Sequence, residues 1–264
     1  MHSLKKIFAI IPVLAVFSCT NTPSTEVIDK TPHKILFIGN SFTYWNSLDV
    51  IVSKIGENLG INLECKRFAV GAQSLLQDAT DGDSLGTQIF ADLRKNQYTD
   101  IVLQDKSNYP YNSPSNFRNG VKQMKEKIVP LQPNAKLYLY ETWGYNSESL
   151  TEPVPKIEQT IRTNTENVAE LYDMSVAYVG KAFTNVFENH KDINLYDNDN
   201  KHPSYAGSFL SALVHVATIT GNHVRSVTYQ GEAGRTSEQG QVTFVDEVTR
   251  NVLIDVAEQA VFGK

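Results

Sequence analysis

From residue 34 to residue 179, short apolar runs alternate with segments whose apolar residues recur every three or four positions. Short apolar runs are typical of strands buried on both faces, and the longer spacing is typical of amphipathic helices. The runs predict strands at 35–38, 62–70, 101–103, 136–141 and 176–179. The spacing predicts helices at 48–59, 85–93, 113–128 and 155–172, and two more that end near 221 and 256.

This alternation of strands and helices predicts a parallel sheet with helices on both faces. We expect one domain, because the sequence shows no internal repeat and no sign of a second domain. Residues 226–240 have the weakest pattern of apolar and polar residues. In parallel sheets of this kind, ligands bind beyond the carboxyl ends of the strands. The residues that directly follow each strand are therefore the first candidates for a functional site.

Composition narrows the class of protein. The chain has 264 residues, a formal charge of −5 and 41% hydrophobic residues, which is ordinary for a globular protein. It has 24 Lys and Arg against 29 Asp and Glu, with no basic run outside the N-terminus, so we expect no nucleic-acid partner. The six histidines lack zinc spacing and no glycine-rich phosphate loop follows a strand, so we expect no metal and no cofactor.

The N-terminus has the pattern of an export signal. Lys5 and Lys6 precede an apolar stretch at 7–17 that is too short to span a bilayer. The stretch ends in Val-Phe-Ser-Cys, which resembles the lipobox of bacterial lipoproteins and implies that the signal is cut before Cys19, which then carries lipid. A plain secretory signal with an incidental Cys19 is the alternative.

We therefore expect a lipoprotein signal peptide at 1–18, a flexible Thr/Ser/Pro-rich tether at 19–32 and a single domain at 33–264. On this reading the protein is anchored to the bacterial cell envelope, and it touches the membrane only through the lipid on Cys19.

Candidate side chains follow the first two predicted strands. Ser41 comes directly after the first strand and close to a helix N-terminus, whose free N–H groups favour negative charge. That setting suits a nucleophile whose attack creates an oxyanion, although a serine there can also be only a helix cap. Gly71 follows the second strand, where its N–H can point at a ligand or simply belong to a turn.

Further candidates follow the later strands. The third strand ends at Gln104, and the amides of Gln104 and Asn108 can donate to a developing negative oxygen or serve structure alone. Asp199 and His202 stand three residues apart before a helix. A carboxylate at that spacing can hold one imidazole nitrogen while the other faces out as a base, but the pair can also be a solvated loop.

Taken together, these segments resemble the SGNH (GDSL-type) hydrolase family from residue 34 to residue 221. Gly39-Asn40-Ser41 stands where many members have Gly-Asp-Ser, and Gly71 matches the glycine block. The third block, Gln104-Asp105-Lys106-Ser107-Asn108, looks more like the Gln-Gly-Glu-Ser-Asn of the carbohydrate acetylesterase branches. The last block is Asp199-x-x-His202, followed by Pro-Ser-x-x-Gly.

The resemblance implies a three-layer α/β/α fold with a flavodoxin-like five-stranded parallel sheet of order 2-1-3-4-5. It implies that Ser41 attacks an ester carbonyl, that His202 takes the proton and that Asp199 orients the imidazolium. The oxyanion would be held by the N–H groups of Ser41 and Gly71 and by the amide of Gln104 or of Asn108.

The function implied is that of an exported, lipid-anchored serine esterase that removes O-acetyl groups, from an acylated glycan or another small ester, without metal or cofactor. Tyr44 and Trp143 would contact the substrate. Two alternatives remain open at this point. One is a non-catalytic glycan-binding lipoprotein that stacks sugars on Trp143, Tyr44 and Trp45. The other is a lipase or an acyltransferase that uses the same Ser-His-Asp set.

Overall fold

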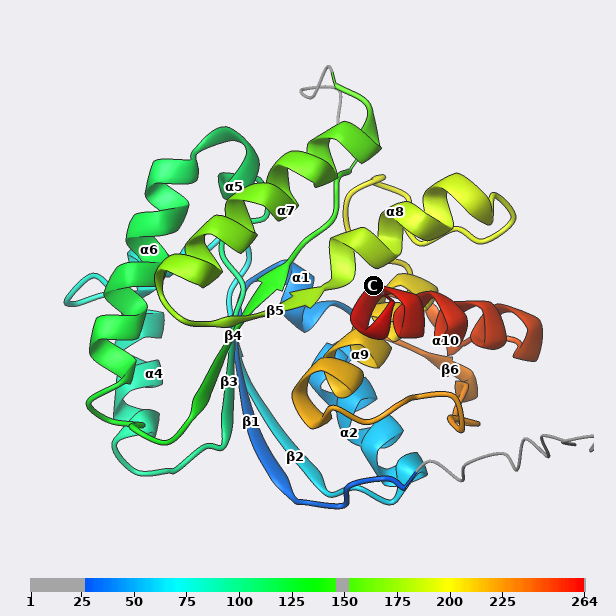
Figure 1. The fold of residues 1–264 in the computed structure, drawn as a ribbon, viewed down its shortest axis with the longest axis horizontal. Coiled ribbons are helices and arrows are strands. Elements are labelled where there is room, and N and C mark those ends of the chain that lie inside the picture. The colour runs from blue at the N-terminus through cyan, green and yellow to red at the C-terminus, as the bar shows by residue number, and fades with distance from the viewer. Residues whose placement is uncertain (1–26, 146–151, 264) are drawn as a thin grey trace, which may run out of the picture.

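The computed structural model describes residues 27–145 and 152–263. The predicted signal peptide at 1–18, the lipidation site Cys19 and the tether up to residue 26 lie outside the described residues. The sheet consists of β1 (His33–Gly39), β2 (Leu63–Ala69), β3 (Asp100–Leu103), β4 (Lys136–Glu141) and β5 (Ser175–Tyr178). All neighbours pair in parallel, in the order β2-β1-β3-β4-β5 (Figure 1). The predicted fold class and strand order are confirmed.

Strand β1 explains why both faces of the sheet are covered. Its consecutive side chains point to opposite faces, and all of Ile35–Ile38 are at most 1% exposed. Ile35 and Phe37 belong to one apolar core, and Leu36 and Ile38 belong to the other. A strand that is apolar at every position has to be buried on both sides, so helices cover both faces.

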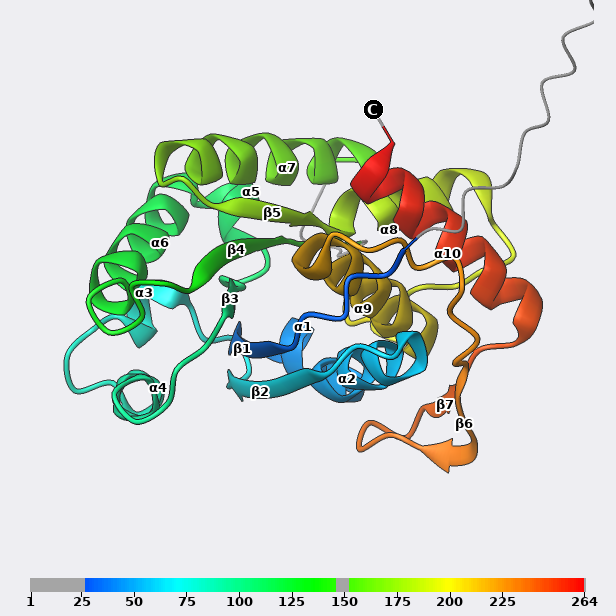
Figure 2. The same cartoon turned by 60° about the horizontal axis from the view of Figure 1, so that its bottom comes forward.

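Figure 2 shows the two helical layers. The first core is closed by α2 (Leu48–Leu59), α8 (Val179–Asn189), α9 (Tyr205–Thr220) and α10 (Glu247–Phe262). The second core is closed by α3 (Leu75–Asp78), α4 (Ser84–Leu93), α6 (Pro114–Ile128) and the C-terminal part of α7 (Val154–Leu171). Two short helices, α1 (Ser41–Tyr44) and α5 (Tyr109–Asn112), follow β1 and β3. Among the described helices, none has the length and apolar character to span a membrane.

Besides the short helices α3 and α5, two larger features were absent from the sequence-based prediction, helix α8 and a hairpin. Helix α8 carries apolar residues at helical spacing, with Val179, Phe183 and Val186 all fully buried, so the signal for it was present. The other is a hairpin of β6 (Gly231–Thr236) and β7 (Val242–Phe244), whose residues are exposed or half-buried. Because neither strand has a buried face, the hairpin has no alternation of apolar and polar residues to reveal it.

Helix α9 places a histidine in the first core. His215 is 0% exposed and lies edge-on to the rings of Phe37 and Tyr140, with centroid distances of 5.4 and 4.5 Å. Within the described residues, neither of its ring nitrogens has a hydrogen-bond partner. Burial lowers the pKa of His215 to about 3, so the folded protein holds a neutral imidazole at any ordinary pH.

This burial predicts a defined pH dependence of stability. In the unfolded chain, His215 takes up a proton as the pH falls through its ordinary pKa of 6.5, and the folded chain does so only near pH 3. Substitution His215→Leu should therefore raise the free energy of unfolding at pH 8, because two unpartnered nitrogens are removed. Its advantage over the wild type should grow by about 2 kcal/mol between pH 8 and pH 5. Urea unfolding at both pH values, with His190→Leu as the control, measures this; an unchanged advantage would contradict it.

Candidate active site

Three predicted residues from distant parts of the chain meet at the carboxyl edge of the sheet. The Oγ of Ser41 lies 2.8 Å from Nε2 of His202. The Nδ1 of the same ring lies 2.5 Å from Oδ2 of Asp199. One imidazole nitrogen thus faces the hydroxyl while the other is held by a carboxylate. This arrangement can move a proton from an alcohol to a histidine and stabilise the imidazolium that results.

The first strand delivers Ser41 to the site. Strand β1 ends at Gly39, Asn40 caps α1 by accepting a hydrogen bond from the N–H of Phe42, and Ser41 is the first residue of that helix. A Cβ at residue 39 would lie 2.3 Å from Oγ1 of Thr43 and 2.7 Å from Oε1 of Gln104. Only glycine fits between these groups, so the sharp passage from strand to helix requires it.

Backbone hydrogen bonds fix the loop that carries the imidazole. Oδ1 of Asp199 accepts the N–H groups of Lys201 and His202, at 3.0 and 2.9 Å, while Oδ2 holds the ring. Partial burial alone would raise the pKa of Asp199, but the hydrogen bonds from His202 and Lys201 lower it below its ordinary value. The carboxylate therefore stays ionised where it orients the ring. Ser204 then caps α9 by accepting the N–H of Gly207.

Trp45, which the sequence analysis named only as a sugar-stacking ring, also lies on the histidine. Its ring is stacked on that of His202 at a centroid distance of 3.9 Å and an angle of 10°. Asn46 and Ser47 directly after it have φ angles of 52° and 56°, which non-glycine residues rarely adopt. Such a turn persists only where its surroundings hold it. The spacing of apolar residues does not reveal this turn, so the contact between Trp45 and His202 could not be predicted from it.

The β6–β7 hairpin supplies those surroundings. From its turn, Oε1 of Gln239 accepts the N–H of Asn46 at 3.0 Å. The amide nitrogen of Asn46 donates to the carbonyl of Pro203 and to Oγ of Ser208, at 3.2 and 3.0 Å. Because Pro203 directly follows the histidine, one buried amide joins the turn after Trp45 to the loop of the imidazole. The hairpin thus belongs to the support of the site.

A cavity of about 270 Å³ opens over the serine. Residues from four segments of the chain line it: Asn40, Ser41, Tyr44, Trp45, Gly71, Ala72, Lys106, Ser107, Asn108, Lys201 and His202. The N–H groups of Ser41 and Gly71 have no hydrogen-bond partner in the described part of the chain. Ala72 has a φ of 60°, so the backbone turns sharply just after Gly71. Two free N–H donors beside a nucleophile can hold a negative oxygen.

The structure corrects the expectation that Gln104 faces the cavity. Its side chain is 1% exposed, and Oε1 accepts the N–H of Asn40 and the hydroxyl of Thr43, each at 3.0 Å. Its amide nitrogen donates to the carbonyl of Asp105. All of its polar atoms are thus used inside the protein. Of the two amides that the sequence offered as a third donor, Asn108 alone lines the cavity.

The structure also corrects the expectation that Trp143 contacts substrate. Its ring is 0% exposed and lies between those of Phe42 and Phe183, stacked at 4.3 and 4.0 Å. Its Nε1 donates to the carbonyl of Lys201 at 3.0 Å. Trp143 therefore packs beneath the loop of the histidine, and its ring cannot reach a ligand. Tyr44, the other predicted contact, does line the cavity.

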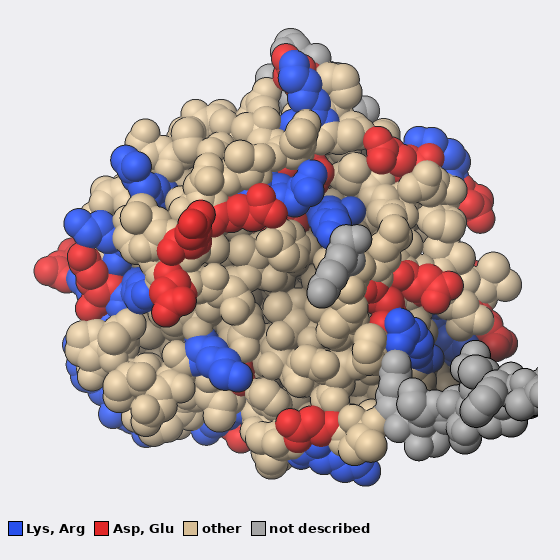
Figure 3. Space-filling view, in the orientation of Figure 1, with Lys and Arg blue, Asp and Glu red and all other residues tan. Residues whose placement is uncertain are grey.

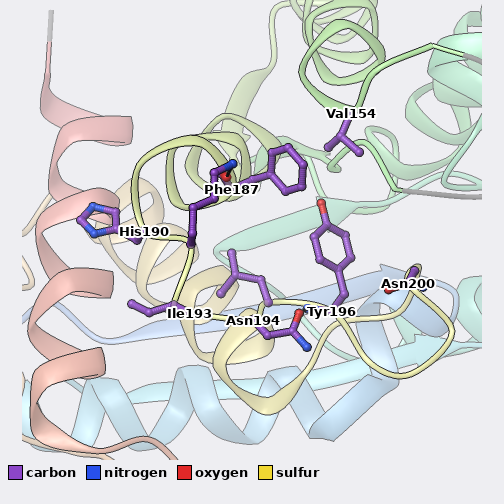
Figure 4. A pocket seen from close by; sticks show the side chains of 9 residues that line it. Val154, Phe187, His190, Ile193, Asn194, Tyr196 and Asn200 are labelled. Carbon is purple, nitrogen blue, oxygen red and sulfur yellow. Dashed lines mark hydrogen bonds between the residues drawn. The ribbon is translucent and has the colours of Figure 1, made fainter.

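A second cavity of about 310 Å³ lies along the segment from α8 to the loop of Asp199. In Figure 4 the side chains of Val154, Phe187 and Tyr196 point toward one another around it, whereas His190 points away. The hydroxyl of Tyr196 is already bonded to the carbonyl of Gly144 at 2.7 Å. No serine or cysteine lines this cavity, whereas Ser41 and His202 both line the first one. In the described residues, no group of three or more His, Cys, Asp or Glu side chains is placed to hold a metal ion.

Comparison with known proteins gives relatives by structure only, because no family model and no curated protein matches the sequence. A DUF4886 family protein from Bacteroides uniformis matches 89% of this chain and 97% of its own, with 17% identity and a TM-score of 0.75.

A protein assigned as an SGNH hydrolase from Slackia heliotrinireducens matches 72% of this chain and 100% of its own, with 23% identity and a TM-score of 0.60. The acetyl xylan esterase AlAXEase matches 70% and 99%, with 13% identity and a TM-score of 0.51. The structural neighbours of this chain thus include SGNH hydrolases, and it shares their three-layer α/β/α fold.

Proposed function

We propose that this chain is a serine ester hydrolase in which Ser41, His202 and Asp199 form the catalytic triad. The observation that carries the proposal is the pair of contacts on one imidazole, 2.8 Å to the serine hydroxyl and 2.5 Å to the carboxylate. A binding protein has no use for a serine activated in this way. The SGNH hydrolases and esterases among the structural neighbours support the same class of reaction.

The contacts define the reaction step by step. Nε2 of His202 takes the hydroxyl proton as Oγ of Ser41 bonds to the ester carbon. The carbonyl oxygen becomes negative and is held by the N–H groups of Ser41 and Gly71. His202 then gives its proton to the alcohol oxygen, the carbon–oxygen bond breaks and an acyl-serine remains. Water attacks in the same way, with His202 again as base and then as acid, and releases the carboxylic acid.

Asn108 is the third oxyanion donor in this proposal. It lines the cavity with Ser41 and Gly71, whereas every polar atom of Gln104 is engaged inside the protein. The Oδ1 of Asn108 is buried and has no partner in the described residues, so the amide has no hydrogen bond that would hold it elsewhere. A donor that faces the developing charge contributes more to the transition state than to the bound ester.

The substrate in this proposal is a carbohydrate that carries a small acyl group such as acetyl. A cavity of about 270 Å³ suits a short acyl chain and a single sugar better than a fatty chain. Tyr44 and Trp45 offer aromatic surface at its wall, and one structural neighbour is an acetyl xylan esterase. The burial of Trp143 removes one of the three rings on which the binding-only alternative relied.

The proposal extends to the place of action. Cleavage before Cys19 and lipidation of its thiol would anchor residues 33–264, as one hydrolase domain, to the bacterial cell envelope through the tether at 19–32. An acylated glycan of the envelope or its surroundings would then lie within reach. Labelling of cells with a palmitate analogue, compared between wild type and Cys19→Ala, tests this part separately.

The triad itself predicts the effect of two substitutions. Ser41→Ala removes the nucleophile and His202→Ala removes its base, so each should lower the hydrolysis of 4-nitrophenyl acetate by at least about 10³-fold. Ser41→Ala should also abolish labelling by a fluorophosphonate probe. The matched controls are Ser115→Ala and His190→Ala, which lie outside the site and should keep wild-type rates. Thermal unfolding checks that all variants fold, and full activity of folded Ser41→Ala would refute the proposal.

Substitutions of Asn108 and Gln104 should affect different quantities, the first the rate of catalysis and the second the stability of the fold. Asn108→Ala should lower kcat by about 10²–10³-fold, because it removes an oxyanion donor, and should leave the unfolding midpoint near that of the wild type. Gln104→Ala should lower the free energy of unfolding by about 1–3 kcal/mol, because the Asn40 N–H and the Thr43 hydroxyl lose their acceptor. Steady-state kinetics and urea unfolding of both variants separate these roles. Wild-type kcat in Asn108→Ala would remove this residue from the oxyanion hole.

A further inference from the structure

The cavity over Ser41 is positively charged although the chain is acidic. Two of its lining residues, Lys106 and Lys201, carry a charge, and no Asp or Glu lines it. Two carboxylates stand beside these lysines in the sequence, and neither lines the cavity. Asp199 lies behind the imidazole, and Asp105 is buried with Oδ1 accepting the N–H groups of Leu75 and Lys106. The formal charge of the whole chain is −5, so the charge around this cavity is opposite in sign to that of the chain as a whole.

Neither ammonium group forms an ion pair in the described part of the chain, and the charge of Lys106 acts only at longer range on the buried carboxyl of Asp105. The Nζ of Lys106 lies over the ring of Tyr109 at 5.5 Å, and that of Lys201 lies over the ring of Tyr145 at 5.4 Å. An aromatic ring attracts a cation but does not cancel its charge. On other surfaces, six lysines form ion pairs, namely Lys34, Lys54, Lys66, Lys122, Lys127 and Lys156. Figure 3 shows Lys and Arg interspersed with Asp and Glu on the face in view.

Both lysines project from backbone that the fold holds in place. The N–H of Lys106 donates to Oδ1 of Asp105 at 2.7 Å. The N–H of Lys201 donates to Asp199, and its carbonyl accepts Nε1 of Trp143 at 3.0 Å. The backbone of both lysines is therefore held at the rim of the cavity, and only their side-chain rotations have to be fixed when they bind an anion.

The position of Lys201 shows which part of an ester meets it. In the proposed reaction His202 protonates the alcohol oxygen, so the alcohol part of the ester has to lie beside the imidazole. Lys201 is the neighbour of His202 along the chain and lines the same cavity. Lys106 comes from the loop after β3, two residues before Asn108, and adds to the positive potential across the cavity.

We propose that this site selects esters whose alcohol part carries a carboxylate, as an acylated uronic acid does. This inference rests on the proposed esterase function and names its substrate class. Lys201 pairs with the carboxylate of the sugar, Lys106 strengthens the attraction, and neither takes part in bond making. The charge pairing stabilises the bound substrate and the transition state equally, so it should lower KM and leave kcat unchanged.

A matched pair of substrates tests the proposal. Methyl galacturonoside and methyl galactoside, each carrying one acetyl group on the same hydroxyl, differ only in a carboxylate against a hydroxymethyl group. The wild type should have a kcat/KM about tenfold higher for the uronoside, through a lower KM, and the preference should shrink in 0.5 M salt. Lys201→Gln should lower the preference about threefold to fivefold, and Lys106→Gln about twofold to threefold.

Lys95→Gln is the control for charge. It removes the same single charge from an exposed lysine that precedes β3, at the opposite edge of the sheet, and should leave the preference unchanged. A second pair, mono-(4-nitrophenyl) succinate and 4-nitrophenyl butyrate, places the anion on the acyl side instead. A preference confined to that pair would overturn the assignment to the alcohol part.

The remaining outcomes separate this inference from the proposed function. An enzyme that hydrolyses 4-nitrophenyl acetate through Ser41 but treats both galactosides equally would overturn the inference and leave the esterase. A preference that survives Lys201→Gln and Lys106→Gln together would also overturn it. A protein that hydrolyses no ester and is not labelled at Ser41 would overturn both.

Discussion

The site depends on the buried amide of Asn40. Its nitrogen donates to the carbonyls of Gln73 and Asp105, at 3.0 and 3.1 Å, and so joins the loop after β1 to the loops after β2 and β3. Its backbone N–H donates to Gln104. Ser41, Gly71 and Asn108, the proposed nucleophile and oxyanion donors, come from these three loops. The hydrogen bonds of this one side chain therefore hold the three loops together, which the pairing of the strands alone would not do. A carboxylate in its place could donate to neither carbonyl, so this asparagine makes two contacts that the aspartate of many members of the resembled family could not make when ionised.

The sheet and the meeting of the triad residues could be predicted from sequence because each leaves a local pattern. A strand buried on both faces is apolar at every position, as β1 is, and parallel strands bring their carboxyl ends to one edge. Polar residues directly after such strands therefore lie close together, however far apart they are in the chain. Ser41 and Gly71 were found by this rule, and His202 by its spacing from Asp199 before a helix.

What the sequence could not provide is the direction in which a side chain points. Gln104 and Trp143 both follow strands at the correct edge, yet one turns into the protein to accept two hydrogen bonds and the other fills a stack of aromatic rings. The contact of Trp45 with the imidazole depends on two residues with positive φ and on a distant hairpin. The directions of these side chains depend on packing partners that are remote in sequence, so the local spacing of apolar residues does not predict them.

The distance along the chain between the proposed nucleophile and its proposed base has a consequence for biosynthesis. Ser41 and His202 are 161 residues apart, and the helix that follows the histidine packs in the first core against α2. While the polypeptide is still emerging from the ribosome, the serine is an ordinary alcohol with no partner to deprotonate it. Reactivity arises only when most of the polypeptide has been made and folded. In the proposed mechanism, a nascent molecule therefore cannot attack esters around it until His202 has been made and the helix after it has folded.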